Sequence, residues 1–142
     1  MCYNIFSGTL LESFSGMEAA MFELKLTSHF SAAHRLRDYK GKCESNHGHN
    51  WKVEVVLRAK DTDNRGMVMD FNEFRERLEG VLEGFDHKCL NDVKPFDVQN
   101  PTTENISREI YIRMASALPE HVSIASVTSF ETDNCGATYF ED

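Results

Sequence analysis

The chain has 142 residues, which is enough for one domain with a substantial hydrophobic core. Its formal net charge of −8 argues against a general binder of nucleic acid or of anionic membranes, because phosphate contacts need clustered cations. No apolar run approaches the roughly 20 residues that span a bilayer, and the four cysteines show no CxxC spacing.

Cysteines without paired spacing are typical of reduced thiols. The first 20 residues contain no Lys or Arg, whereas a secretory signal begins with a positively charged region. We therefore expect a cytoplasmic protein without nucleic-acid or membrane partners. A small phosphorylated substrate stays compatible with the charge, since it needs only a few local cations.

We expect residues 1–20 to be an N-terminal tail, which can be disordered, and residues 21–142 to form a single domain. Apolar and polar residues alternate over 21–33, which predicts a strand that His34 closes. A second strand is predicted over 47–60 by the same alternation. The polar stretch between the two strands contains a glycine and is expected to be a loop.

Two helices are predicted in succession after the second strand. Asp70 has the character of an N-cap and begins an apolar stripe of helical period that Gly84 ends. Thr102 or Thr103 can cap the second helix, which stops before Pro119. The segment between the helices contains two prolines and is predicted to be irregular.

Two further strands are predicted near the C-terminus, over residues 121–131 and 135–140. Val122, Ile124 and Phe130 are expected to lie on one face of the first of them. The order of elements indicates an α+β fold, in which a four-stranded antiparallel sheet carries two sequential helices on one face. Because such a sheet leaves its other face and both edges open, we expect a homo-oligomer.

A pair of histidines in the second strand is the first chemical signal. His47 and His49 project from one face, because residues i and i+2 of a strand point to the same side. With His34 they make three histidines without a fourth protein ligand, which is typical of a catalytic zinc site with an open position. A cupin-like iron or manganese site is the alternative, but the glutamate that cupins place after such a pair would be Glu54, which lies in the opposite register.

Three other positions are candidates for acid–base or binding chemistry. Cys43 lies four residues before His47, where its thiol can act as an acid–base group beside the metal or can be a surface thiol. Asp86 can orient the adjacent His87 as a second proton-transfer pair, or the two can simply end a helix. The carboxylate of Glu131 can accept two parallel hydrogen bonds from a guanidine-like heterocycle, or it can be a solvated strand end.

Six stretches carry a resemblance to a known family. They are FSAAHRL at 30–36, CESNHGHN at 43–50, GMVMDF at 66–71, FDHKCLND at 85–92, NPTTEN at 100–105 and ETDN at 131–134. Together they resemble the family of 6-pyruvoyl-tetrahydropterin and 6-carboxytetrahydropterin synthases, which have the tunnelling fold (T-fold). The resemblance covers nearly the whole chain from Phe22 to Glu141, and the ββααββ order agrees with that fold.

The resemblance implies a role for each candidate residue. It implies Zn²⁺ on His34, His47 and His49, Cys43 as general base, and Asp86 with His87 as the second proton-transfer unit. It further implies that Glu131 anchors a pterin ring, with Thr102 or Thr103 close to it. In this family the subunits assemble into a barrel, as hexamers or related oligomers, and a neighbouring subunit contributes the Asp–His pair to each active site.

The resemblance also implies a lyase that acts on 7,8-dihydroneopterin triphosphate. The three residues between Cys43 and His47 are similar to the branch that forms 6-carboxy-5,6,7,8-tetrahydropterin, releases acetaldehyde and triphosphate, and feeds 7-deazaguanine and queuosine synthesis. Glu44 stands where a third branch has Glu in place of Cys and makes 6-hydroxymethyl-dihydropterin for folate. That product, alone or together with the first, is an alternative, as is a 6-pyruvoyl product. A pterin- or metal-binding protein without turnover is the non-enzyme alternative.

Overall fold

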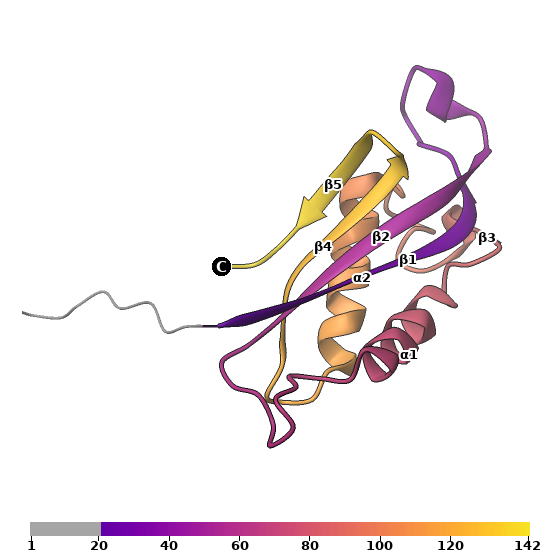
Figure 1. Ribbon diagram of the computed structural model, residues 1–142. Helices are drawn as coiled ribbons and strands as arrows, with labels where there is room; N and C mark the ends of the chain where they lie inside the picture. Colours follow the sequence, from indigo (N-terminus) through magenta and orange to yellow (C-terminus); the bar gives the residue numbers. More distant parts are fainter. Residues whose placement is uncertain (1–20) are drawn as a thin grey trace, which may run out of the picture.

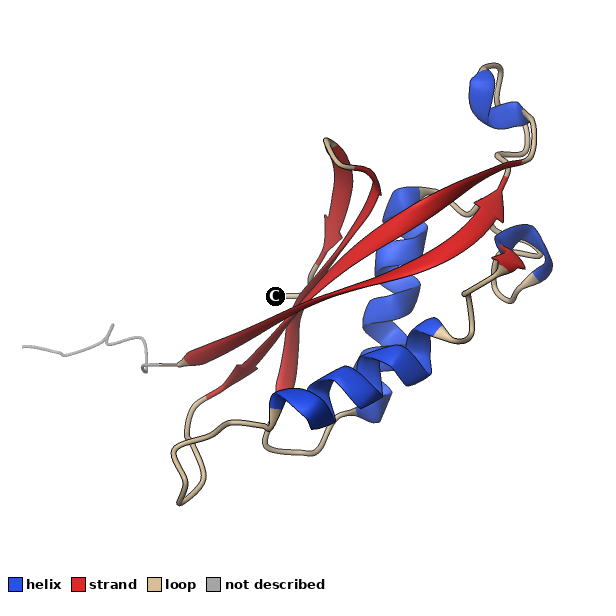
Figure 2. Ribbon diagram, turned by 45° about the vertical axis from the view of Figure 1, so that its right-hand side comes forward, coloured by secondary structure: helices blue, strands red, loops and turns tan. Residues whose placement is uncertain are grey.

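A computed structural model describes residues 21–142, so the expected N-terminal tail lies outside the described residues. Both helices cover one face of a single sheet, and the other face is free of helices (Figures 1 and 2). No helix in this described part is both long and apolar enough to cross a membrane. The elements in chain order are β1 (Phe22–His34), the short 3₁₀ turn η1 (Lys42–Glu44), β2 (His47–Ala59), α1 (Phe71–Leu82), β3 (Lys88–Cys89), the 3₁₀ turn η2 (Leu90–Asp92), α2 (Thr103–Ala117), β4 (Ser123–Thr132) and β5 (Cys135–Tyr139).

The sheet has five strands in the order β3-β1-β2-β4-β5, which confirms the α+β class with two sequential helices. All neighbouring strands are antiparallel except β1 and β3, which pair in parallel through Ala32 and Ala33. The sequence predicts four strands, and β3 is the addition. A strand of two residues is too short to show any alternation, so the sequence predicts only an irregular segment there.

The longest elements follow from simple sequence rules. β1 and β2 form a continuous hairpin that pairs from Phe22 with Ala59 up to His34 with His47. The side chain of Asp70 caps α1 by accepting a hydrogen bond of 2.7 Å from a backbone N–H of the first turn, as its position before the apolar stripe predicts. The hairpin is longer than the helices that cover it, so its loop extends past the rest of the sheet (Figure 1).

The hydrophobic core lies between the sheet and the two helices. Even-numbered residues of β1 and odd-numbered residues of β2 supply its floor, as the alternation predicts. The helices cover this floor with the apolar stripes read from the sequence. Fully or almost fully buried side chains include Phe30, Trp51, Val53, Val55, Leu57, Phe74, Leu78, Phe85, Phe96, Ile106, Ile110 and Met114.

A β-bulge interrupts β4. Val56 of β2 pairs with Ser126, whereas the next residue, Leu57, pairs with Ile124. Ala125 is therefore an extra residue in β4, and it has no direct partner in β2. Because two residues of β4 oppose one of β2 at this point, the alternation of side chains between the two faces shifts by one residue beyond it.

The bulge makes one prediction from the sequence wrong. Val122, Ile124 and Phe130 do not share one face. After the bulge the odd-numbered Val127 is the buried residue, and Phe130 points to the side without helices. The same shift turns Glu131 toward the helix-covered face of the sheet. β4 is irregular a second time at Glu131 itself, which lies between the pairs Phe130–Gly136 and Thr132–Cys135 of the β4–β5 ladder.

Candidate functional site

Three histidines meet at the end of the sheet where the β1–β2 hairpin leaves the core. His34 ends β1, and His47 pairs with it across the ladder at the start of β2. The ring centroids of His34 and His47 are 4.7 Å apart, those of His47 and His49 are 4.7 Å apart, and those of His34 and His49 are 5.2 Å apart. The structure therefore brings together the three residues that the sequence predicts as a cluster.

Hydrogen bonds orient two of these imidazoles. Nδ1 of His34 lies 2.8 Å from the carbonyl oxygen of Pro101, and Nδ1 of His47 lies 2.7 Å from that of Ser45. A carbonyl only accepts hydrogen bonds, so each Nδ1 is the donor, and in the neutral ring the lone pair is then on Nε2. This is the arrangement of metal-binding histidines, which commonly donate their second ring N–H to a carbonyl.

The Nε2 atom of His34 is buried without a hydrogen-bond partner among the described residues, and the buried Nε2 atom of His49 faces the Glu131 carboxylate. Burial lowers the pKa of both imidazoles, and this cause outweighs the opposing effect of the Glu131 carboxylate. Both rings are thus neutral near pH 7, the form that binds a metal ion. Buried nitrogen atoms of neutral rings that converge on one point fit a metal ion well.

Glu131 is a fourth group at the cluster, although the sequence predicts no fourth protein ligand there. Its Oε1 lies 2.9 Å from Nε2 of His49, 3.8 Å from that of His34 and 3.9 Å from that of His47. Four ligands of a tetrahedral zinc ion, with bonds of about 2.0–2.1 Å, lie roughly 3.3–3.4 Å from one another. The oxygen therefore lies at distances that suit a ligand rather than at the centre of the site, and the four ligand atoms are all within 4.8 Å of one another.

The two threonines at the start of α2 have different positions. Thr102 caps the helix, because its hydroxyl accepts a hydrogen bond of 3.2 Å from the backbone N–H of Asn105. The hydroxyl of Thr103 donates a hydrogen bond of 3.3 Å to Oε2 of Glu131. Of the two candidates in the sequence, Thr103 is thus the one that reaches the carboxylate.

Trp51 forms the floor beneath the histidines. Its ring meets His34 and His49 edge-on, at centroid distances of 5.1 Å and 5.4 Å, and it stacks on Phe30 at 6.0 Å. The indole N–H donates to the carbonyl of Ala32 at 3.3 Å, which satisfies the polar atom of this fully buried side chain. The imidazoles of His34 and His49 therefore pack against buried aromatic side chains. Trp51 is the only tryptophan of the chain.

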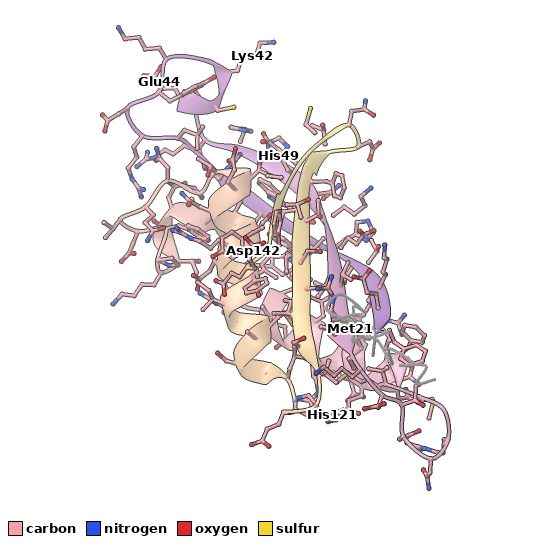
Figure 3. The ribbon with its side chains drawn as sticks, turned by 90° about the vertical axis from the view of Figure 1, so that its left-hand side faces the viewer. Met21, Lys42, Glu44, His49, His121 and Asp142 are labelled. Carbon is pink, nitrogen blue, oxygen red and sulfur yellow. The ribbon has the colours of Figure 1, made fainter. Side chains whose placement is uncertain are left out.

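Cys43 lies in η1, in the loop that joins the two strands of the hairpin. Its carbonyl accepts a hydrogen bond of 2.8 Å from the backbone N–H of Leu36 on the other side of the loop. Figure 3 shows Lys42 and Glu44, its neighbours in this turn, beyond the end of the sheet, whereas His49 lies nearer to the tip of the β4–β5 hairpin. Cys43 is partly buried and Glu44 is exposed.

Asp86 and His87 form a contact of their own. Oδ2 of Asp86 lies 2.8 Å from Nδ1 of His87, and Oδ1 accepts the backbone N–H of Ser31 at 2.8 Å. This last hydrogen bond is the main cause that lowers the pKa of Asp86. The His87 backbone donates to the Ser31 carbonyl at 2.6 Å and has a φ of 55°, a left-handed conformation that is uncommon outside glycine.

No hydrogen bond or ion pair joins the Asp86–His87 pair to the histidine cluster among the described residues. The His87 side chain is 82% exposed and borders a surface pocket of about 430 Å³ together with Ser31, Gly48, His49 and Asn50. Ser31, Gly48 and Asn50 alternate with the buried residues of β1 and β2, so this pocket lies on the face without helices. The structure brings Asp86 and His87 together, and the pocket that His87 borders reaches His49, but the described contacts include no bond between the pair and the three histidines.

Comparisons with known proteins agree with this picture. A family model described as 6-pyruvoyl tetrahydropterin synthase matches residues 23–142. A 6-carboxy-5,6,7,8-tetrahydropterin synthase of Synechocystis is 35% identical over 117 residues, which are 78% of this chain and 87% of that protein. A 6-pyruvoyl tetrahydrobiopterin synthase of Poecilia reticulata is 40% identical over 104 residues, which are 63% of this chain and 71% of that protein.

Solved structures extend the similarity to the fold. The structure of 6-pyruvoyl tetrahydropterin synthase from Caenorhabditis elegans superimposes with a TM-score of 0.78 at 29% sequence identity, covering 89% of this chain and 100% of that chain. The likeness thus spans the described sheet, including the two strands that carry the histidines, and both helices. The chain belongs to the 6-pyruvoyl tetrahydropterin synthase family.

Proposed function

We propose that residues 21–142 form a zinc-dependent lyase domain that converts 7,8-dihydroneopterin triphosphate into 6-carboxy-5,6,7,8-tetrahydropterin and releases acetaldehyde and triphosphate. The observation that carries this proposal is the convergence of the Nε2 atoms of His34, His47 and His49 at the base of the loop that holds Cys43. The product would enter 7-deazaguanine and queuosine synthesis in the cytoplasm.

The residues of the cluster fit zinc. Neutral imidazoles and a carboxylate are ordinary zinc ligands, and the distances around Glu131 suit tetrahedral coordination. His34, His47 and His49 would hold the ion. Zinc bound there would act as a Lewis acid toward the two side-chain hydroxyl groups of the pterin substrate and acidify the adjacent C–H and O–H bonds.

Glu131 would bind the pterin ring. Its carboxylate can accept two parallel hydrogen bonds from the 2-amino group and the N3–H of the ring. The hydroxyl of Thr103 already holds one of its oxygen atoms, which limits the rotation of the side chain. The other oxygen lies beside His49, so a ring held by both oxygen atoms would draw the carboxylate away from the metal ligands.

Cys43 and His87 would transfer protons to and from the substrate side chain, with Asp86 holding the His87 ring. Because no hydrogen bond or ion pair joins the Asp86–His87 pair, at the edge of β1, to the three histidines among the described residues, we propose that it serves the site of a neighbouring subunit. This supports a homo-oligomer with active sites between subunits. The outer edge of β1 has no partner strand over most of its length within the described residues, so it is available for pairing between subunits.

Glu44 favours a second candidate function. It occupies the same 3₁₀ turn as Cys43 and is exposed, so its carboxylate is free to replace the thiol as the base. That chemistry would give 6-hydroxymethyl-dihydropterin for folate, alone or together with the carboxy product. The relatives named above include both carboxy and pyruvoyl synthases at similar identity, so 6-pyruvoyl-tetrahydropterin stays an alternative product.

A product assay tests the proposal. The zinc-loaded protein is incubated with 7,8-dihydroneopterin triphosphate, the pterins are identified by mass, and any aldehyde is trapped. We expect 6-carboxy-tetrahydropterin with acetaldehyde from the wild type and from Glu44→Gln, and neither from Cys43→Ala. A hydroxymethyl product that disappears in Glu44→Gln would instead support the folate-type reaction. Absence of any product from folded, zinc-bound protein would favour the binding protein without turnover.

A further inference from the structure

We infer that Asn91 and Asn100 are positioning residues that fix the Cys43 loop relative to the histidine cluster. The inference rests on the proposed role of Cys43 as a base and deepens it. Neither asparagine touches the histidines, and their side chains act on the backbone of residues 35–37, directly after β1.

Asn91 binds this backbone through both atoms of its side-chain amide. Its Oδ1 accepts the N–H of Arg35 at 2.9 Å, and its Nδ2 donates to the carbonyl of Arg35 at 3.0 Å. The side chain is buried, with only 6% of the residue exposed. Both hydrogen bonds are therefore protected from water and define the position of Arg35 closely.

Asn100 repeats the arrangement two residues further along. Its Oδ1 accepts the N–H of Arg37 at 2.8 Å, and its Nδ2 donates to the carbonyl of Arg37 at 3.0 Å. In an extended chain, residues i and i+2 present their N–H and C=O groups to the same edge. The two amides thus take the place of a neighbouring strand and continue the hydrogen bonding of β1 past His34.

The residue between these two contacts holds Cys43. The N–H of Leu36 points to the opposite edge of the same backbone and donates to the carbonyl of Cys43 at 2.8 Å. A shift of residues 35–37 would therefore move Cys43 with it. Among the described contacts, this is the only backbone hydrogen bond between Cys43 and residues 35–37, which follow β1. The two asparagines therefore hold the segment to which Cys43 is bonded.

The segment that carries the asparagines also orients a histidine of the cluster. The carbonyl of Pro101, next to Asn100, accepts the hydrogen bond from His34. Asn105 of α2 fixes this turn by donating to the carbonyl of Asn100 at 2.9 Å, and the Arg37 guanidinium donates to the carbonyl of Phe96 at 2.9 Å. One rigid segment thus sets both the direction of a metal ligand and the place of the thiol.

Catalysis by a general base depends strongly on such placement, because a misplacement of about 1 Å can reduce a rate by roughly 100-fold. Asn91→Asp and Asn100→Asp keep the size of the side chain and its acceptor oxygen. They replace the amide N–H donor with a second oxygen, which repels the backbone carbonyl opposite it. We expect kcat to fall by roughly 10- to 100-fold in each variant, with KM for the pterin and the zinc content unchanged. Asn64→Asp, in an exposed turn, is the matched control and should change nothing.

Hydrogen exchange separates this role from a general loss of stability. The Asp variants should exchange faster at Leu36 and through the Cys43 loop, while α1 and β2 stay as protected as in the wild type. The rate at which Cys43 is alkylated, measured by mass spectrometry, should also differ from that of the wild type in these variants. If an Asp variant does not fold, Asn91→Ser and Asn100→Ser remove the amide with less repulsion and carry the same expectations.

Two results would overturn the inference: unchanged exchange in the loop of folded variants, or a loosened loop with an unchanged kcat. If the wild type turns over no pterin, the proposed function fails. Exchange at Leu36 and the alkylation rate of Cys43 then decide by themselves whether the asparagines hold the loop.

Discussion

Oε1 of Glu131 lies 2.9 Å from Nε2 of His49, so a carboxylate of β4 reaches the imidazoles of β1 and β2. This contact joins the two halves of the proposed site, the metal ligands and the group that would hold the pterin ring. It depends on the end of β4, where a bulge at Ala125 and a second irregularity at Glu131 change the register of the strand. The same carboxylate is therefore within reach of both a metal ion and a ring.

Glu131→Gln should separate these two contributions. The neutral amide loses the charge-assisted pair of hydrogen bonds to the ring, and such bonds are worth about 1.5–3 kcal/mol each, so we expect KM for the pterin to rise at least tenfold. If the carboxylate also supports the metal, zinc affinity measured by competition with a chelator should fall as well. Glu76→Gln, on the exposed side of α1, is the control. An unchanged KM would leave Glu131 without a role in ring binding.

His47→Ala should abolish zinc binding and turnover together, because two remaining imidazoles hold zinc poorly. Zinc content can be measured directly, and the quenching of Trp51 fluorescence by Cu²⁺ gives a second readout at the site. His121→Ala is the matched control, since His121 lies at the opposite end of the molecule from His49 (Figure 3). Full zinc occupancy in His47→Ala would contradict the proposed ligand set.

Cys43→Ala should keep its zinc and lose its turnover. Removal of a general base typically costs about 10²–10⁴-fold in rate, whereas the three imidazoles that would hold the metal stay in place. Cys135→Ala removes an exposed thiol from the β4–β5 hairpin and should leave both properties unchanged. Loss of zinc from Cys43→Ala would mean that the thiol is a ligand rather than a base.

The sequence predicts those parts of the site that depend on strand alternation. His47 and His49 share a face because they are two residues apart, and His34 joins them because the hairpin pairs in a register that buries one face of each strand. The cap of α1 by Asp70 likewise follows from local chemistry. These features depend on neighbours in the chain, and the pattern of residues is enough to find them.

Other parts depend on contacts between distant segments. The bulge at Ala125 leaves no mark in the hydrophobic pattern, so the approach of Glu131 to the histidines could not be predicted from the sequence. Asn91 and Asn100 bond to backbone groups more than fifty residues away, and an asparagine in a loop carries no sign of its partner. β3 is defined only by its pairing with β1.

The left-handed backbone of His87 leads to a prediction about stability. A β-branched residue at a φ of 55° is strained by roughly 1–2 kcal/mol, whereas asparagine tolerates this conformation well. His87→Val should therefore lower the free energy of unfolding in urea by about that amount, and His87→Asn should leave it nearly unchanged. Both variants should lose turnover if His87 transfers a proton. Equal stability of the two variants would show that the left-handed turn is not retained in solution.

Two histidines of the cluster, the buried His34 and the partly buried His49, predict how stability depends on pH. Burial lowers the pKa of His34 and His49 below the ordinary value of about 6.5. As the pH falls below about 6.5, the unfolded chain therefore binds protons that the native protein does not bind, and native stability decreases. The decrease ends once the pH lies below the lowered pKa values, because both states are then protonated.

We expect Tm of the metal-free protein to be nearly constant above about pH 7.5 and to fall toward about pH 5.5. Asp86, whose pKa is also lowered, contributes to a separate loss at more acidic pH, because a carboxylate is protonated only there. His34→Gln should flatten the step near neutrality, since glutamine does not titrate. With zinc bound the fall should be steeper, because protons compete with the metal for the same nitrogen atoms. A metal-free Tm that rises on acidification in this window would contradict the neutral, metal-ready state of the two imidazoles.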